Sequence, residues 1–109
     1  MAKYLMIESR DCFEYGDAPY FIEQAQGLAS KGNDVTMFLV QNGVLMARKG
    51  VDDNPVAKIA KGKVKVLADD FCLRERGIPS TSLLDGIGVS NVDQLVDMLA
   101  QDGVKAVWH

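Results

Sequence analysis

Short apolar runs alternate with polar or amphipathic stretches along the chain, and this alternation predicts the order of strands and helices. Tyr4–Ile7 is a continuous apolar run, as in strands that are buried on both faces, and Val35–Val40 is the clearest run of apolar and β-branched residues. Weaker strand patterns occupy Lys63–Ala68, Ile87–Val89 and Val104–Trp108. The pattern therefore predicts a sheet of short strands.

Two stretches have the periodicity of amphipathic helices. The first follows Asp17, which we expect to cap it, and ends at Gly32. The second follows Ser90–Asp93, which fits a capping box. We expect this second helix to turn five apolar side chains inward: Val92, Leu95, Val96, Leu99 and Ala100. Shorter helical segments are predicted at Val44–Lys49, Val56–Lys61 and Asp69–Gly77.

Strands and helices in alternation are typical of right-handed βαβ units, which build a parallel sheet covered by helices. At 109 residues, the chain is expected to form one domain over residues 1–109. We therefore expect a three-layer α/β/α sandwich with a small, mainly parallel sheet of the flavodoxin-like type. A core of this size leaves no room for a deep cavity, so a ligand site is expected at the surface or between subunits.

Charge and composition argue against several classes of function. The net charge is −3 and the basic residues are scattered, so we expect no direct binding to nucleic acid or to an anionic membrane. The apolar runs are far shorter than the roughly 20 residues that span a bilayer, and no signal peptide is visible. We therefore expect a cytoplasmic protein in which Cys12 and Cys72 are free thiols.

Both cysteines fall where a parallel sheet normally places its chemistry, beyond the carboxyl ends of the strands. Cys12 follows the first predicted strand and Cys72 follows the third. Cys72 also lies near the start of a predicted helix, where the helix dipole lowers the pKa of a thiol. The alternative is that both cysteines are inert packing residues.

Charged neighbours of Cys72 are expected to act in opposite directions. Arg74 and Arg76 favour a thiolate, whereas Asp69 and Asp70 oppose its formation. In the loop after the second strand, Asn42-Gly43 is expected to supply a tight turn in the left-handed conformation that both residues tolerate.

Other chemistry has weaker support in the sequence. The first loop contains four acidic residues that offer a candidate cation site: Glu8, Asp11, Glu14 and Asp17. The alternative is an ordinary acidic surface loop, which is common. His109 is the only histidine, which argues against zinc, and no phosphate-binding glycine pattern follows a strand. Six large apolar residues near loops and termini are expected to contribute to a surface for self-association: Phe13, Tyr15, Tyr20, Phe21, Met46 and Trp108.

Three segments, in order along the chain, carry a resemblance to a known family. The first leads from Asp17-Ala18-Pro19 to Asp34–Val44, where a strand ends in a Gly-Val pair that starts the next helix. The second is Val64–Phe71 followed by Arg76-Gly77, a strand, an acidic pair and an Arg-Gly turn. The third is a polar helix and a short strand that ends in Val107-Trp108. Together they resemble the DsrE/DsrF/DsrH-like (TusBCD-like) sulfur-relay family over nearly the whole chain.

The resemblance implies a domain that assembles into oligomers such as trimers and hexamers. Some members of the family carry sulfur as a cysteine persulfide and pass it between partners, in sulfur oxidation or in tRNA thiolation. Such transfer needs an accessible thiolate where a partner docks. In the DsrE/TusD branch the carrier cysteine stands at the place that Asp69 takes here, and Cys72 follows one helical turn later. The resemblance thus implies Cys72 as the carrier, with Cys12, which matches no family cysteine, as the weaker candidate.

Two hypotheses of different classes follow. The leading one is an intracellular sulfur-relay protein, a persulfide carrier or sulfurtransferase-like protein that needs no cofactor and no metal. Its expected partners are further copies of itself and other sulfur-relay proteins. The alternative is a non-catalytic oligomeric binding or assembly module of the same fold. A flavin or nucleotide binder, suggested by fold analogy, is disfavoured by the missing phosphate loop.

Overall fold

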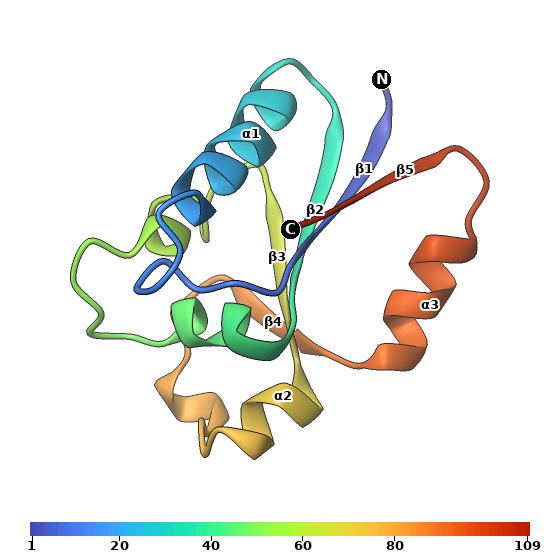
Figure 1. Cartoon of the computed structure of the whole chain (residues 1–109). Helices are drawn as coiled ribbons and strands as arrows, with labels where there is room; N and C mark the ends of the chain where they lie inside the picture. The colour runs from blue at the N-terminus through green and yellow to red at the C-terminus, as the bar shows by residue number, and fades with distance from the viewer.

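The computed structural model describes residues 1–109 and contains one five-stranded sheet (Figure 1). The strands are β1 (Lys3–Glu8), β2 (Asp34–Leu39), β3 (Lys65–Asp69), β4 (Ile87–Ser90) and β5 (Val104–Trp108). They lie in the order β4-β3-β2-β1-β5, and every neighbouring pair is parallel. The predicted parallel α/β fold is confirmed, and the strands differ from the predicted ones only at their ends.

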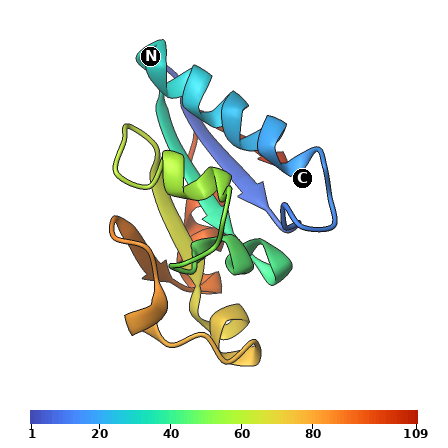
Figure 2. The same cartoon turned by 90° about the vertical axis from the view of Figure 1, so that its left-hand side faces the viewer.

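Helices cover both faces of the sheet, which gives the predicted three layers. The α-helices are α1 (Ala18–Ser30), α2 (Asp70–Glu75) and α3 (Val92–Ala100). Three 3₁₀ helices join them: η1 (Gln41–Ala47), η2 (Pro55–Lys58) and η3 (Ser80–Ser82). Figure 2 shows α1 and η2 in front of the sheet and α3 behind it. No helix combines the length and the apolar character needed to cross a bilayer.

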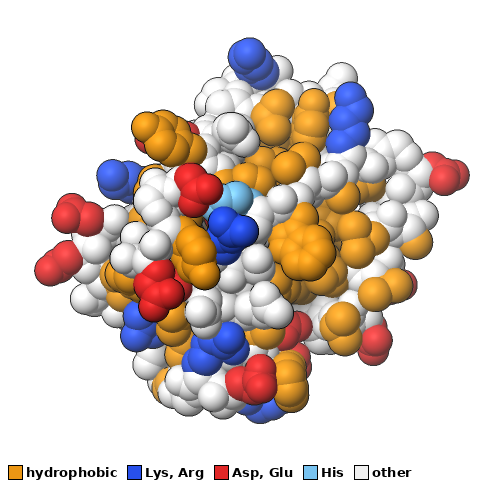
Figure 3. Space-filling model, in the orientation of Figure 1, with side chains coloured by type: hydrophobic (Ala, Val, Ile, Leu, Met, Phe, Trp, Pro, Cys, Tyr) orange, Lys and Arg blue, Asp and Glu red, His pale blue; other side chains and the backbone are white.

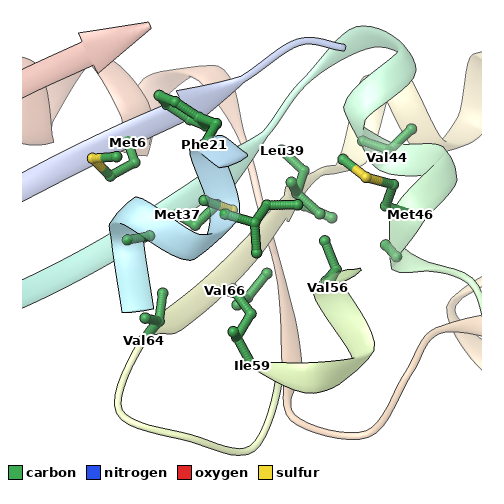
Figure 4. Packing of buried hydrophobic residues seen from close by; sticks show 14 of the residues in the cluster. Met6, Phe21, Met37, Leu39, Val44, Met46, Val56, Ile59, Val64 and Val66 are labelled. Atoms are coloured by element: carbon green, nitrogen blue, oxygen red, sulfur yellow. The ribbon is translucent and has the colours of Figure 1, made fainter. Parts of the chain in front are cut away.

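The main core lies between the sheet and the layer formed by α1, η1 and η2 (Figure 4). Met6, Met37 and Val66 come from three neighbouring strands and point to this side. Phe21 of α1 and Val56 of η2 belong to the same buried cluster. Burying a side chain of this kind contributes about 1.5–3 kcal/mol, so this layer holds most of the hydrophobic stabilisation. Phe21 and Met46 belong to this core, so the expectation that they help form a surface patch is wrong.

The opposite face of the sheet is covered less completely. Its buried cluster has only four members: Leu5, Ile7, Phe38 and Leu67. Leu95 and Met98 of α3 pack against this cluster, but no residue of α3 is buried. The expectation that α3 turns five apolar side chains inward is therefore wrong. The helix meets the sheet along a narrow stripe, and Val92, Val96 and Leu99 remain exposed.

Two helix caps also differ from the prediction. Ser90 ends β4, and the cap of α3 is Asn91, whose side-chain oxygen accepts a hydrogen bond from the backbone N–H of Gln94. Asp17 stands at the N-cap position of α1, but its side chain makes no capping hydrogen bond. Its carboxylate instead accepts a bond from the imidazole of His109. The imidazole of His109 thus takes the place of the backbone amides.

Candidate functional site at the carboxyl edge of the sheet

Cys72 lies in the first turn of α2, directly beyond the end of β3. The residue is 8% exposed, and its Sγ accepts a hydrogen bond of 3.1 Å from the backbone N–H of Gln41. Its own backbone N–H donates to Oδ2 of Asp69 at 2.9 Å, which makes Asp69 the N-cap of the helix. Capping by Asp is favoured because the carboxylate satisfies an amide that has no partner within the helix. The structure thus joins the loop after β2 and the start of α2 at the sulfur of Cys72.

The acidity of Cys72 differs from the sequence-based expectation. Burial raises the pKa of the Cys72 thiol, and the neighbouring Asp69 carboxylate raises it further. The N–H of Gln41 and the charge of Arg76 act in the opposite direction without reversing the shift. The expected lowering of the pKa by the helix start is therefore wrong, because burial of the thiol and the Asp69 carboxylate together outweigh the groups that favour a thiolate.

The loop after β2 makes its turn at Gln41, which has φ 49 in the left-handed region. The prediction that Asn42-Gly43 takes this conformation is wrong. The side-chain oxygen of Asn42 instead accepts hydrogen bonds from Nε and Nη2 of Arg76, at 3.1 and 3.0 Å. Nη1 of Arg76 donates to the backbone oxygen of Cys72 at 3.2 Å. One guanidinium group therefore ties the Gln41 loop to α2.

Gly43 has a packing role on the other side of the same loop. A Cβ atom added at Gly43 would lie 2.2 Å from the backbone oxygen of Glu8, at the end of β1. That oxygen also accepts a hydrogen bond from the N–H of Val40. Only glycine permits this close approach of two backbone segments. Gly43 is thus required by close packing and not by a positive φ.

Arg74 and Asp70 do not belong to the immediate surroundings of the sulfur. Nη1 of Arg74 lies 3.2 Å from Oδ2 of Asp70; the Arg74 side chain is exposed and that of Asp70 is half-exposed. The guanidinium of Arg74 also lies over the ring of Phe71. Of Arg74 and Arg76, only Arg76 hydrogen-bonds to Cys72 itself, through the backbone oxygen.

An open groove of about 490 Å³ lies beside Cys72, between the starts of α2 and α3. It is lined by nine residues: Val40, Asp69, Asp70, Phe71, Cys72, Arg74, Asn91, Val92 and Leu95. Val40 and Leu95 also line a second, wholly apolar groove that continues toward β5. The remaining residues of this second groove are Ile7, Leu99, Ala106, Val107 and Trp108. Figure 3 shows apolar side chains gathered on this face, over α3 and β5. Cys72 thus lies near one end of a mostly apolar surface.

Cys12 lies in the loop after β1, half-buried against the main core. Burial raises the pKa of its thiol, and the charge of Asp11 adds to the effect. Cys12 and Cys72 are both free thiols, as expected. No backbone N–H of another residue donates to the Cys12 sulfur, and Cys12 does not line the groove beside Cys72. Cys12 therefore remains the weaker candidate.

A cluster of ionisable groups that the sequence reasoning missed lies at the same edge of the sheet. Nδ1 of His109 lies 3.0 Å from both carboxylate oxygens of Glu8, and Nε2 lies 2.9 Å from Oδ2 of Asp17. The imidazole also stacks on the ring of Phe21, with 5.2 Å between centroids. Asp11, by contrast, accepts backbone hydrogen bonds within its own loop. Three of the four acidic residues of the candidate cation site, Glu8, Asp11 and Asp17, therefore have other partners, and no group of residues in the structure could hold a metal ion.

The pKa values of this cluster shift for different reasons. Burial raises the pKa of Glu8, although the Arg10 amide and His109 act against it. The hydrogen bond with His109 lowers the pKa of Asp17. Burial alone would lower the pKa of His109, but Asp17 and Glu8 outweigh it and the pKa is raised. The one available signal in the sequence was an acidic residue, Glu8, directly after a buried apolar strand.

Comparisons with known proteins agree with this architecture. The chain is similar to the YchN protein from E. coli, with 20% identity and a TM-score of 0.84 over 98% of this chain and 100% of that one. It is also similar to MTH1491 from Methanobacterium thermoautotrophicum, a protein of unknown function, with 18% identity and a TM-score of 0.81 over the whole of both chains. At these identities the likeness shows the fold alone. None of the curated proteins matches the chain.

The comparison with family models identifies the family as well as the fold. The model of the DsrE/DsrF-like family matches residues 14–107, which include α1, all of β2 to β4, and Cys72 with its surrounding loops. A match of this extent covers most of the chain and both segments that meet at the Cys72 sulfur. The chain therefore belongs to the DsrE/DsrF-like family.

Proposed function

We propose that this chain is a sulfur-relay protein that takes up sulfur on Cys72 as a persulfide and passes it to a partner protein. The observation that carries the proposal is the position of the Cys72 sulfur. Cys72 lies at the carboxyl edge of the sheet and is one of the residues that line an open groove, and a backbone N–H of Gln41 is directed at its sulfur. Family membership supports the same reading, because the resemblance to the sulfur-relay proteins implies this chemistry.

The chemical step requires only a thiolate and a donor persulfide. The Cys72 thiolate attacks the outer sulfur of the donor, the sulfur–sulfur bond of the donor breaks, and a new sulfur–sulfur bond forms on Cys72. The donor leaves as a thiolate and takes up a proton, which balances the proton that Cys72 releases. No electrons are gained or lost overall, so the step needs no bound cofactor. Passage to an acceptor thiol repeats the same exchange.

The surroundings of Cys72 set the fraction of reactive thiolate. Its raised pKa keeps most of the sulfur protonated at neutral pH. Gln41 and Arg76 are the two groups that stabilise a negative charge there, through an N–H and a guanidinium charge respectively. Transfer should therefore become faster as the pH rises toward the pKa of Cys72.

Loading with a persulfide donor tests the proposal directly. The protein is incubated with the donor and digested without reductant, and mass spectrometry follows the peptides that contain Cys72 and Cys12. We expect a gain of one sulfur atom on Cys72, its loss in Cys72→Ser, and its retention in the matched variant Cys12→Ser. A wild-type protein that stays unloaded, while an established carrier in the same experiment becomes loaded, would disprove the proposal.

The near-complete burial and raised pKa of Cys72 favour a second candidate, a non-catalytic binding or assembly module. In this case Cys72 acts only as a packing residue. The two candidates differ in one measurement, because a binding module keeps its partner and its cellular role in the Cys72→Ser variant. A sulfur carrier loses transfer in the same variant.

Both candidates include self-association through the apolar surface of α3 and β5. Leu99 is 46% exposed and Trp108 is 72% exposed, and both line the apolar groove. Contiguous apolar surface of this kind is typical of protein interfaces. We propose that a second copy of the chain covers it, in a trimer or hexamer of the kind that the family resemblance implies.

A further inference from the structure

The loop that carries the Gln41 N–H is held from two sides. On one side, the Asn42 side chain accepts two hydrogen bonds from Arg76, whose guanidinium also binds the backbone of α2. On the other side, Gly43 packs directly against the backbone oxygen of Glu8 at the end of β1. Gln41 lies between Val40, which is bonded to that same oxygen, and Asn42. The position of its N–H is therefore set by contacts outside the loop.

We propose that Asn42 and Arg76 are positioning residues for Cys72, and that their paired hydrogen bonds hold the Gln41 N–H against the sulfur on which charge develops. This inference deepens the proposed function and rests on Cys72 as its reacting atom. Neither side chain needs to touch the substrate. Asn42 acts through the backbone that follows Gln41, and Arg76 acts by fixing Asn42.

The left-handed conformation of Gln41 supports this assignment. A non-glycine residue in this region is strained, and such residues persist where the surrounding structure fixes them. The bonds from Arg76 to Asn42 provide this constraint at the next residue. In their absence the loop is free to relax, and a relaxed Gln41 would withdraw its N–H from Cys72.

Arg76 has two separable effects on Cys72. Its charge lowers the pKa of the thiol across space, and its paired N–H groups hold Asn42. Arg76→Lys keeps the charge but loses the paired donor geometry, because lysine has a single ammonium group. Asn42→Ala keeps the charge and removes the acceptor. If only the charge matters, both variants should behave as the wild type does.

The experiment measures the rate of alkylation of Cys72 by iodoacetamide against pH, resolved by peptide mass spectrometry. The midpoint of the profile reports the pKa of Cys72, and the plateau at high pH reports access to the sulfur. For Asn42→Ala and Arg76→Lys we expect the midpoint to move to higher pH, with a rate at pH 7.5 that is about 3- to 10-fold lower for a shift of about half to one pKa unit. Cys12 in the same samples is an internal control whose midpoint should stay unchanged.

Two further variants separate positioning from a general loss of structure. Asn42→Gln retains an uncharged amide acceptor for Arg76, so its midpoint should return toward the wild-type value without the effect of an added charge. Arg74→Gln removes a nearby arginine that does not bind Asn42, so its midpoint should remain at the wild-type value. Unfolding curves identify any variant that does not fold, and the Asn42→Gln profile then decides the matter.

Unchanged midpoints in folded Asn42→Ala and Arg76→Lys would overturn the inference, and so would a shift in Arg74→Gln as large as theirs. This outcome is distinguishable from failure of the proposed function. A wild-type protein that takes up no sulfur rejects the relay function, whereas the alkylation midpoints still report whether Asn42 and Arg76 set the acidity of Cys72.

Discussion

The imidazole of His109 lies with its Nδ1 at 3.0 Å from both carboxylate oxygens of Glu8, a side chain that is completely buried. This contact joins the residue after β5 to the last residue of β1, and it gives a buried acid a hydrogen-bonding partner that is charged when protonated. A buried carboxylate without such a partner is costly, so the pair links stability to the protonation of His109.

Replacement of His109 by Gln should make the protein less stable at mildly acidic pH than at alkaline pH, relative to the wild type. The pKa of folded His109 is raised above its ordinary value of 6.5. Its stabilisation is therefore fully present below that value and is lost as the pH rises through the folded pKa. We expect a loss of about 1.5–3 kcal/mol near pH 6, in the range for hydrogen bonds between charged groups.

Urea unfolding of both proteins at a series of pH values measures this difference. Glu23→Gln is a matched control, because Glu23 is an exposed acid of α1 outside the cluster of His109, Glu8 and Asp17. A difference between wild type and His109→Gln that stays constant from pH 5.5 to pH 9 would contradict the prediction (the interval brackets the ordinary histidine value).

Substitution of Gly43 by Ala should destabilise the fold, because the added methyl group would overlap the backbone oxygen of Glu8. Overpacking of this kind costs about 1–3 kcal/mol, and a rigid backbone neighbour favours the upper end. Gly27 offers the matched control, since nothing lies within 4 Å of a Cβ placed there, inside α1. Gly27→Ala should stabilise the protein by about 0.5–1 kcal/mol. Thermal or urea unfolding will show whether the two alanines act with opposite signs.

Asp69→Asn should make Cys72 react faster at neutral pH. Asp69 raises the pKa of the Cys72 thiol, and the amide removes its charge while it still caps α2. Alkylation of Cys72 should therefore show a midpoint at lower pH, with little change in unfolding free energy. Asp70→Asn serves as the control, because Asp70 pairs with Arg74 on the surface. Equal midpoints for wild type and Asp69→Asn would exclude this role of the carboxylate.

Leu99→Ser should weaken self-association without unfolding the chain. Leu99 is half-exposed and lines the apolar groove, so the isolated chain loses little packing when it changes. Sedimentation velocity at micromolar concentration should show a shift from oligomer to monomer. Val89→Ser, on β4, replaces an apolar residue of similar exposure (49% against 46% for Leu99) outside the groove and should leave the oligomer intact. A wild-type protein that sediments as a monomer would refute the proposed interface.

The sequence predicted the parallel fold well because local patterns decide it. Buried runs such as Val35–Val40 have no alternative place in a small domain, and the periodicity of α1 matches the face that it buries. The same reasoning gave a wrong prediction for α3. An apolar stripe shows which face of a helix is suited to burial, but it does not show whether the chain itself or another molecule buries that face. For α3, much of that face is still exposed within the single chain.

The candidate site was predictable in its location and not in its chemistry. Strand order places Cys72 at the carboxyl edge, as expected from its place after β3. The pKa of the Cys72 thiol depends on where the Asp69 carboxylate lies. It also depends on a hydrogen bond from the backbone N–H of Gln41, a residue far away in the sequence. The contact between His109 and Glu8 likewise depends on β5 pairing with β1, which no local pattern reveals.

That pairing has a consequence for how the chain reaches its native state. The strand β1 has β2 on one side and β5 on the other, and Lys3 aligns with Val104 across the second pair. Until β5 docks, β1 is an open edge of the sheet, with the amides and carbonyls on that side unpaired. Contacts so distant in sequence form slowly, and an unpaired edge invites pairing with other chains. The folding chain is thus exposed to aggregation through β1 in the interval before β5 docks.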